Sequence, residues 1–311
     1  MIKSPHMKSG FTLIEISIVL VIIGLIVGGI LVGRDLIAAA TIRAQVSQIE
    51  KYQTATNTFR SKYGYLPGDI PDPTAQQYGF VARGTFAGEG DGDGYIEGLS
   101  SDAANTLCGG CNLGGETATY WVDLSAANLI DGGFIAAAPA SFPAAVTGVG
   151  IDAYMPQAKL GGGNYVFVMA NINNTTHKMI GGNYFAIAPV TQVAGNGTNA
   201  SPGNATPTGF SVAAAYAIDT KIDDGFPQSG RALAGFTCCP GGSGYSWTEY
   251  NPVYPARSIA AAGFPAASNA AVAPAAYTCY DNNSTANTPR QYSVGQNSGS
   301  GLNCTLEIKF Q

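Results

Sequence analysis

The sequence predicts an α+β fold, in which a long N-terminal α-helix, transmembrane in its first half, packs on an antiparallel β-sheet domain with long loops. Three observations predict it. An apolar run at 11–33 continues into a pattern of helical period that ends near residue 63. The segments 164–170 and 179–189 are rich in β-branched and aromatic residues, as strands are. The 41 glycines and 17 prolines among 311 residues leave long stretches that we expect to be loops.

The run at 11–33 is apolar except for Glu15. A helix of this length is about 34 Å long, enough to cross the hydrocarbon core of a bilayer. A helix buried in a soluble protein would be shorter and would show a polar face, so we expect a membrane-spanning helix. Glu15 lies near its start, where a carboxylate is usually paired or functional. The alternative is a carboxylate at the membrane interface that reaches water.

The leader at 1–10 contains lysines and no acidic residue. Such a leader is typical of a secretory signal, but the small residue Gly10 stands before the apolar run rather than after it. The segment that runs from Gly10 and Phe11 to Glu15 resembles the N-terminal signal of type IV pilins and of the pseudopilins of type II secretion.

This resemblance implies that a prepilin peptidase cuts between Gly10 and Phe11 and that the new amine of Phe11 is methylated. A methylated amine remains a cation. Glu15 of one subunit can therefore neutralise the Phe11 amine of a neighbouring subunit when the helices pack side by side. Such a pair sets the axial register, because an unpaired charge in apolar surroundings is strongly unfavourable.

The resemblance also implies where the protein acts and with what. We expect a single-pass inner-membrane protein with a periplasmic C-terminal domain, and later a periplasmic or extracellular filament. The implied partners are other pilin or pseudopilin subunits, the prepilin peptidase and the inner-membrane assembly platform. The large domain at 64–311 favours a minor or specialised structural subunit, and a filament-tip module for binding or adhesion is the alternative.

Residues 34–63 are predicted to continue the helix to about Lys62 with one apolar face, which a sheet should cover. The residues of this face are Ile42, Val46, Ile49, Tyr52, Thr56, Phe59 and Tyr63. The residues predicted to lie off it are Arg43, Gln45, Gln48, Lys51 and Arg60. Gly64 and Pro67 end the helix, and 62–69 resembles the turn that follows the helix in pseudopilin-like proteins.

The segment 72–135 is predicted to be loop-rich, with a short helix near 120–130. Within it, acidic residues alternate with glycines, and Glu89, Asp91, Asp93 and Tyr95 are candidate calcium ligands. The pattern is similar to the middle of an EF-hand loop but lacks the closing glutamate, since Ser100 stands there. Calcium is a candidate cofactor, and an acidic turn without a metal is the equal alternative.

The sheet is predicted from a hairpin of the strands 164–170 and 179–189, joined through 171–178. The segment 210–218 suits either a helix or a strand, and 304–310 is expected to be a closing strand at the sheet's edge. Between them, Asp219, Asp223 and Asp224 form a second acidic group that can bind a metal or cap turns, with Lys221 to neutralise it.

Six cysteines follow residue 100, an even number that suits disulfides in an oxidising compartment. The six are Cys108, Cys111, Cys238, Cys239, Cys279 and Cys304. A small disulfide between Cys108 and Cys111 is expected, with half a metal site or free thiols as alternatives. Neighbours bond to each other only with strain, so Cys238 and Cys239 are expected to pair with Cys279 and Cys304.

Composition argues against two classes of function. Charged residues make up 11% of the chain, the net charge is −5 and no basic patch is visible, so nucleic-acid binding is not expected. There are two histidines, and no nucleophile, metal or phosphate-loop motif stands in a suitable context. We therefore expect that the protein is not an enzyme.

Overall fold

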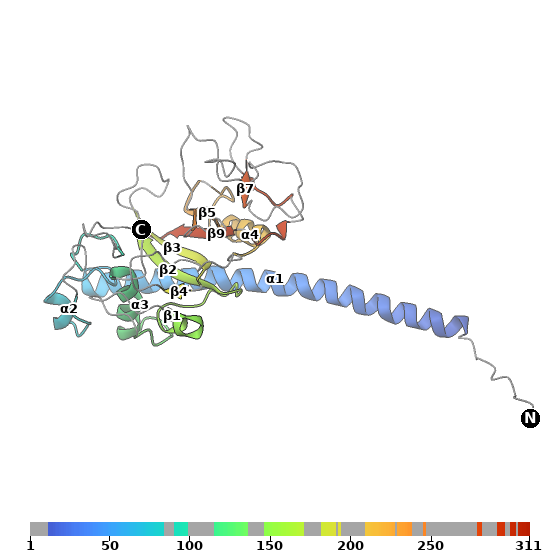
Figure 1. The fold of residues 1–311 in the computed structure, drawn as a ribbon, viewed down its shortest axis with the longest axis horizontal. Coiled ribbons are helices and arrows are strands. Elements are labelled where there is room, and N and C mark those ends of the chain that lie inside the picture. Colours follow the sequence, from blue (N-terminus) through green and yellow to red (C-terminus); the bar gives the residue numbers. More distant parts are fainter. Residues whose placement is uncertain are drawn as a thin grey trace, which may run out of the picture. The chain divides into compact units, whose positions relative to one another are not determined.

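The computed structural model (Figure 1) describes residues 12–83, 90–98, 115–135, 146–170, 182–190, 192–193, 209–227, 229–237, 245–246, 279–281, 291–295, 299–302 and 304–311. The fold is α+β, with a long N-terminal helix and an antiparallel β-sheet, as the sequence predicts. The chain divides into two compact units, Met1–Thr41 and Ile42–Gln311.

Helix α1 extends over Leu13–Tyr63, which confirms the range predicted from hydrophobic period to within a residue. In the first unit its apolar side chains are exposed, from Leu13 (91% exposed) to Ile37 (69%). Among the described residues, α1 is the one helix whose length and composition suit a membrane span. A helix that is apolar on all sides is expected in a protein core or in a membrane, and no other described part of the chain covers this one.

In the second unit α1 buries its predicted apolar face. Ile49, Tyr52, Thr56 and Phe59 are buried, and the other members of the face pack against the same core. The ring of Tyr52 meets that of Trp121 edge-on, with their centroids 4.9 Å apart. The period of three and four residues therefore marks the side of the helix that the domain covers.

Gln45 and Gln48 correct the predicted face, because both lie buried although they are expected off it. The amide nitrogen of Gln48 donates to the carbonyl oxygen of Gln157 (2.8 Å), and its amide oxygen accepts from the N–H of Lys159 (3.1 Å). The amide oxygen of Gln45 accepts from the N–H of Leu160 (3.2 Å). These side chains satisfy backbone groups of a loop that packs on the helix, which is why polar residues are buried there.

The sheet has five strands, and every neighbouring pair is antiparallel. They are β2 (Asn164–Ala170), β3 (Asn183–Pro189), β5 (Ala232–Thr237), β6 (Tyr245–Ser246) and β9 (Cys304–Lys309), in the order β2-β3-β9-β5-β6. The pairing of β2 with β3 confirms the predicted hairpin, whose connection at 171–181 lies outside the described residues.

Strand β9 lies at the centre of the sheet, so its predicted place at the edge is wrong. It pairs with β3 through Leu306–Ile187 and with β5 through Leu306–Ala234. Residues 304–308 are all buried. The backbone groups of a buried strand need hydrogen-bonding partners along both edges of the strand. Strand β9 has them because it lies between β3 and β5.

Helices α1 and α3 (Glu116–Ala126) lie against the face of the sheet that carries Phe185. The ring of Phe185 in β3 lies 6.3 Å from the ring of Tyr52 in α1 and 6.3 Å from that of Tyr120. Side chains alternate along a strand, so Tyr184 and Ala186 point to the opposite face.

Two small sheets accompany this one, β1 (Val146–Thr147) with β4 (Gln192–Val193) and β7 (Tyr280–Asp281) with β8 (Gln291–Tyr292).

The shorter helices settle two predictions. The helix expected near 120–130 is α3 (Glu116–Ala126), which begins earlier than expected. The segment 210–218 forms the start of a helix rather than a strand, α4 (Val212–Ile222), because the Ser211 side chain accepts a hydrogen bond from the N–H of Ala214 and caps it. The others are α2 (Thr74–Gln77) and the 3₁₀ helix η1 (Gly148–Ala153).

Candidate functional site

The first turn of α1 contains a reciprocal capping arrangement between Thr12 and Glu15. The backbone N–H and the hydroxyl of Thr12 both donate to Glu15 Oε2, at 2.7 and 2.8 Å, and the Glu15 N–H donates to the Thr12 hydroxyl oxygen at 3.3 Å. This is a capping box, in which Thr and a Glu three residues later satisfy each other's backbone groups. Sequence reasoning missed the role of Thr12, although the Thr-x-x-Glu spacing gives it.

The capping box fixes where the Glu15 carboxylate lies. It is bonded to the first described residue after Phe11, and both Thr12 and Glu15 are exposed. Gly10 and Phe11, the predicted cleavage and methylation sites, lie outside the described residues. The carboxylate is thus held at the start of α1 with no other part of the described chain covering it.

The glycines of the same segment contact no other described part of the chain. A methyl group added at Gly24, Gly28, Gly29 or Gly33 would meet no heavy atom of the described residues within 4 Å. Small residues on an apolar helix let another helix approach closely. The surface of this part of α1 therefore suits helix packing between chains.

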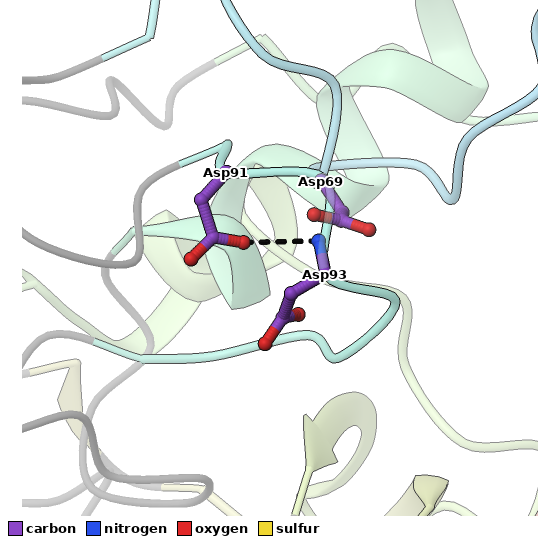
Figure 2. A group of neighbouring side chains, drawn as sticks. All are labelled: Asp69, Asp91 and Asp93. Carbon is purple, nitrogen blue, oxygen red and sulfur yellow. Dashed lines mark hydrogen bonds between the residues drawn. The ribbon is translucent and has the colours of Figure 1, made fainter.

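A group of three carboxylates lies after the end of α1, and Figure 2 shows it. Oxygen atoms of Asp69, Asp91 and Asp93 all lie within 4.8 Å of one another. The structure thus brings together the predicted candidates Asp91 and Asp93, and adds Asp69, which sequence reasoning missed. Its place in the turn at 62–69 was the only signal for it. Glu89 lies outside the described residues.

Backbone N–H groups hold these carboxylates in place. Asp69 accepts from the N–H of Gly92 (2.7 Å) and of Gly94 (2.9 Å), one on each oxygen. The Asp93 N–H donates to Asp91 Oδ1 (3.0 Å), and the Tyr95 N–H donates to Asp93 Oδ1 (2.8 Å). Tyr95 therefore supports the group through its backbone.

Two buried glutamates lie beside this group. Glu116 accepts from the N–H of Gly90 (2.7 Å) and from that of Glu97 (2.9 Å). The Glu97 side chain is 2% exposed, and neither of its carboxyl oxygens has a hydrogen-bond partner among the described residues. Burial, followed by the negative charges of Asp93, Asp91 and Asp69, raises the pKa of Glu97 to about 8.

The pKa of Asp69 is raised for the same reasons. Burial, aided by the charges of Asp93 and Asp91, raises the pKa of Asp69 to about 7, although the hydrogen bonds from the N–H groups of Gly92 and Gly94 lower it. The region therefore concentrates negative charge in a place that solvates it poorly.

A buried ion pair between Arg83 and Asp123 lies next to this region. Arg83 donates to both oxygens of Asp123, at 2.6 Å from Nη2 and 3.3 Å from Nη1, and both side chains are almost fully buried. Arg83 Nε also donates to the carbonyl oxygen of Ile70 (3.0 Å), and the Gly68 N–H donates to Asp123 (2.7 Å). The pair thus connects the turn after α1 with helix α3.

The second predicted group, Asp219, Asp223 and Asp224, is also brought together within 4.8 Å. Its carboxylates all have protein partners. Asp219 accepts from the Tyr292 hydroxyl (2.7 Å), Asp224 accepts from the Ser229 hydroxyl (2.7 Å), and Asp223 accepts from the N–H of Arg231. Turn capping accounts for these contacts, and metal binding here stays a prediction.

Lys221 forms no ion pair with the second group among the described residues, so its predicted neutralising role stays a prediction. Lys221 is exposed in the last turn of α4, where a cation instead complements the negative end of the helix dipole.

Cys279 and Cys304 are bonded to each other, with Cα atoms 5.0 Å apart. The prediction that they pair with Cys238 and Cys239 is therefore wrong. Cys304 begins the central strand β9, and the Cys279 carbonyl accepts from the N–H of Ser293, next to β8. Strand pairing places the two close together, which sequence spacing does not reveal. Cys108, Cys111, Cys238 and Cys239 lie outside the described residues.

Comparison with known proteins bears on the N-terminal segment. A family model described as the prokaryotic N-terminal methylation motif matches residues 5–31. No curated protein and no solved structure matches the chain. The matched residues include the second half of the leader, Glu15 and the exposed apolar residues of α1 up to Leu31. The chain therefore carries the N-terminal methylation signal of the type found in type IV pilins and pseudopilins.

Proposed function

We propose that the chain is a minor or specialised structural subunit of a type IV pilus or of a filament like that of type II secretion. The observation that carries this proposal is the exposed apolar half of α1 within the methylation motif. A prepilin peptidase cuts after Gly10, the Phe11 amine is methylated, and the subunit waits in the inner membrane with its domain in the periplasm.

Assembly replaces lipid by neighbouring helices around the same apolar surface. Lipid tails are as apolar as the side chains, so helix association there rests on close packing and polar contacts. Gly24, Gly28, Gly29 and Gly33 permit close approach because no described part of their own chain occupies the space beside them. The assembly platform lifts the subunit, and other pilin or pseudopilin subunits take the place of lipid.

Glu15 supplies the charge that fixes the register. In the single subunit its carboxylate is bonded to Thr12 and to no cation among the described residues. In the filament, the Phe11 amine of a neighbour completes an ion pair. A shift by one residue would leave both charges unpaired in an apolar medium, at a cost of about 3–5 kcal/mol.

The test distinguishes the effect of the Glu15 charge on filament assembly from the effect of the capping box. Glu15→Gln keeps an oxygen that caps the helix but removes the charge, whereas Thr12→Ala removes the cap and keeps the charge. We expect both variants to insert and to be cleaved. Glu15→Gln should enter filaments about tenfold less or worse, and Thr12→Ala should enter them nearly as well as the unchanged chain.

Filament incorporation is measured by immunoblot of sheared filaments against the membrane fraction. Glu50→Gln is the matched control, because Glu50 is exposed on the same helix. Normal incorporation of Glu15→Gln would contradict the register role, and poor incorporation of Thr12→Ala alone would assign the effect to the helix cap.

A filament-tip module for binding or adhesion is the second candidate. It is favoured by the extent of the unit Ile42–Gln311, which is far more than α1 needs to cover its apolar face. Copy number distinguishes the two: gold-labelled antibodies would mark the ends of filaments if the subunit sits at the tip, and their whole length if it does not.

A further inference from the structure

Two opposite charges stand next to each other on the exposed part of α1. Arg34 and Asp35 follow directly on the apolar run, and they are the only charged residues between Ile16 and Ile42. Both side chains are exposed, and neither takes part in an ion pair with any residue that the structure describes. The helix thus carries a cation and an anion without partners on an otherwise uncharged surface.

Helix geometry prevents these two charges from being satisfied along α1 itself. Successive residues of an α-helix point about 100° apart, so side chains at i and i+1 do not face each other. A partner on the same helix would have to stand three or four residues away. Those positions are apolar for both residues: Ile30, Leu31, Ile37 and Ala38 for Arg34, and Leu31, Val32, Ala38 and Ala39 for Asp35.

Asp35 lies on the side of α1 opposite Glu15. Twenty positions separate the two residues, which at about 100° per residue leaves them about 160° apart around the helix axis. Gly24 and Gly28 lie within about 20° of Asp35. A methyl group on either glycine would meet no described heavy atom within 4 Å, so a second helix has room to approach closely on this side.

We propose that Arg34 of one copy of this chain forms an ion pair with Asp35 of a neighbouring copy, where two α1 helices pack side by side. The inference rests on the proposed function, in which neighbouring helices replace lipid around α1. It adds a second contact to the one at Glu15, because Glu15 and Asp35 face opposite sides of the helix and so meet different neighbours.

The charges of α1 complement those of an identical helix. In two parallel copies without an axial shift, Arg34 of one and Asp35 of the other differ by one residue in height, about 1.5 Å. A guanidinium group and a carboxylate form a bidentate pair of defined geometry. Because the two charges point about 100° apart, the Arg34 side of one helix meets the Asp35 side of the next. Contacts of this heterologous kind continue from subunit to subunit and generate filaments.

The pair gains importance when the helices assemble. In a single subunit both charges stand at the end of the apolar run, where long polar side chains reach the water at a membrane surface. Helix packing removes that water, and a charge without a partner is then strongly unfavourable. The pair therefore favours addition of the next subunit rather than insertion of the first one.

The first test reverses each charge in turn. Arg34→Asp leaves two acidic residues at this place, and Asp35→Arg leaves two basic ones. We expect each variant to insert and to be cleaved, but to appear in sheared filaments about tenfold less than the unchanged chain. The double variant exchanges the two charges and should return to within about threefold of the unchanged chain, which shows that neither substitution harms the helix itself.

Co-expression of the two single variants tests whether the pair forms between chains. Each variant supplies the charge that the other lacks, so contacts between unlike chains restore the pair on both sides. With different epitope tags on the two chains, we expect both to return to filaments to within about threefold of the unchanged chain. Precipitating one tag from sheared filaments should also bring down the other. Absence of recovery in both the double variant and the mixture would overturn the proposal.

The remaining outcomes separate this contact from other roles of the same residues. Glu50→Arg is the control, because it reverses an exposed charge on the same helix in the other unit and should leave incorporation unchanged. A loss in Arg34→Asp alone would assign Arg34 to lipid headgroups and overturn the pair. Normal incorporation of both reversals would do so too, and it would leave the role of Glu15 intact if Glu15→Gln still fails to enter filaments.

Discussion

At the scale of single residues, Glu307 places a carboxyl group in the protein core, away from water. It lies in the centre of β9, opposite Ala186 of β3 and Leu233 of β5, and it is fully buried. In the described part of the chain neither carboxyl oxygen has a hydrogen-bond partner, and the nearby Thr305 hydroxyl has none either. Burial raises the pKa of Glu307 well above its usual value, so the folded protein holds this carboxyl in its neutral form.

This burial predicts a pH dependence of stability. The folded state keeps a proton that the unfolded chain releases above its ordinary pKa. The free energy of unfolding therefore falls as pH rises, by up to about 1.4 kcal/mol per pH unit from this residue. Glu307→Gln resembles the neutral form and should lose that contribution, so its advantage over the unchanged chain should grow from pH 5 to pH 8.

Urea unfolding at several pH values, followed by the fluorescence of the buried Trp121, measures this difference. Tyr184 faces Glu307 from β3 and titrates only at high pH, since burial raises the pKa of Tyr184 to about 12. Glu50→Gln serves as the exposed control. Parallel pH profiles of Glu307→Gln and the unchanged chain would contradict the prediction.

At the scale of elements, the Arg83–Asp123 pair determines how the turn after α1 joins α3. Breaking a buried ion pair by removing one partner leaves the other charge without compensation. Asp123 would retain the N–H of Gly68 and lose both bonds from Arg83. The connection between these elements therefore depends on the pair as a unit.

We predict that Arg83→Met destabilises the protein by about 3–5 kcal/mol, and that adding Asp123→Leu restores a large part of the loss. The second change removes the uncompensated charge at the cost of one bond to Gly68. Lys51→Met is the control, because it breaks the exposed pair with Asp131 and should change stability little. Urea midpoints of the variants provide the comparison; an equal loss in the single and double variants would argue against charge burial.

At the scale of the whole molecule, one helix serves two units. Up to Thr41, α1 exposes its apolar side chains, and from Ile42 onward it contributes to the core of the domain. The two functions meet within a continuous helix of 51 residues. The domain therefore does not depend for its packing on the part of α1 that carries the methylation motif.

A chain that begins at Ile42 should consequently leave the membrane fraction and keep the unfolding temperature of the full-length protein to within a few degrees. A chain that begins at Gln53 is the contrast, because it also loses Ile49 and Tyr52 from the core. Removing such large buried side chains costs about 2–5 kcal/mol each. Equal unfolding temperatures of the two truncated chains would show that this face of α1 contributes little.

Several features of the protein could be predicted from the pattern of residues within short segments of the sequence. Hydrophobic period gives the length of α1 and its buried face, and alternation gives the β2–β3 hairpin. The segment from Gly10 to Glu15 indicates the pilin-type signal, and alternating acids and glycines indicate Asp91 and Asp93 as a group. In each case the signal is the spacing of residues within one short segment, and the two strands of the hairpin follow each other directly in the chain.

Tertiary structure alone decided the features that depend on residues far apart in the chain. It brought Asp69 to Asp91 and Asp93, placed β9 in the centre of the sheet, bonded Cys279 to Cys304 and buried Gln45 against a distant loop. The physical reason is common to all four. Each requires two segments to meet across a long connection, and which segments meet is settled by packing of the entire core rather than by the local preferences of either one.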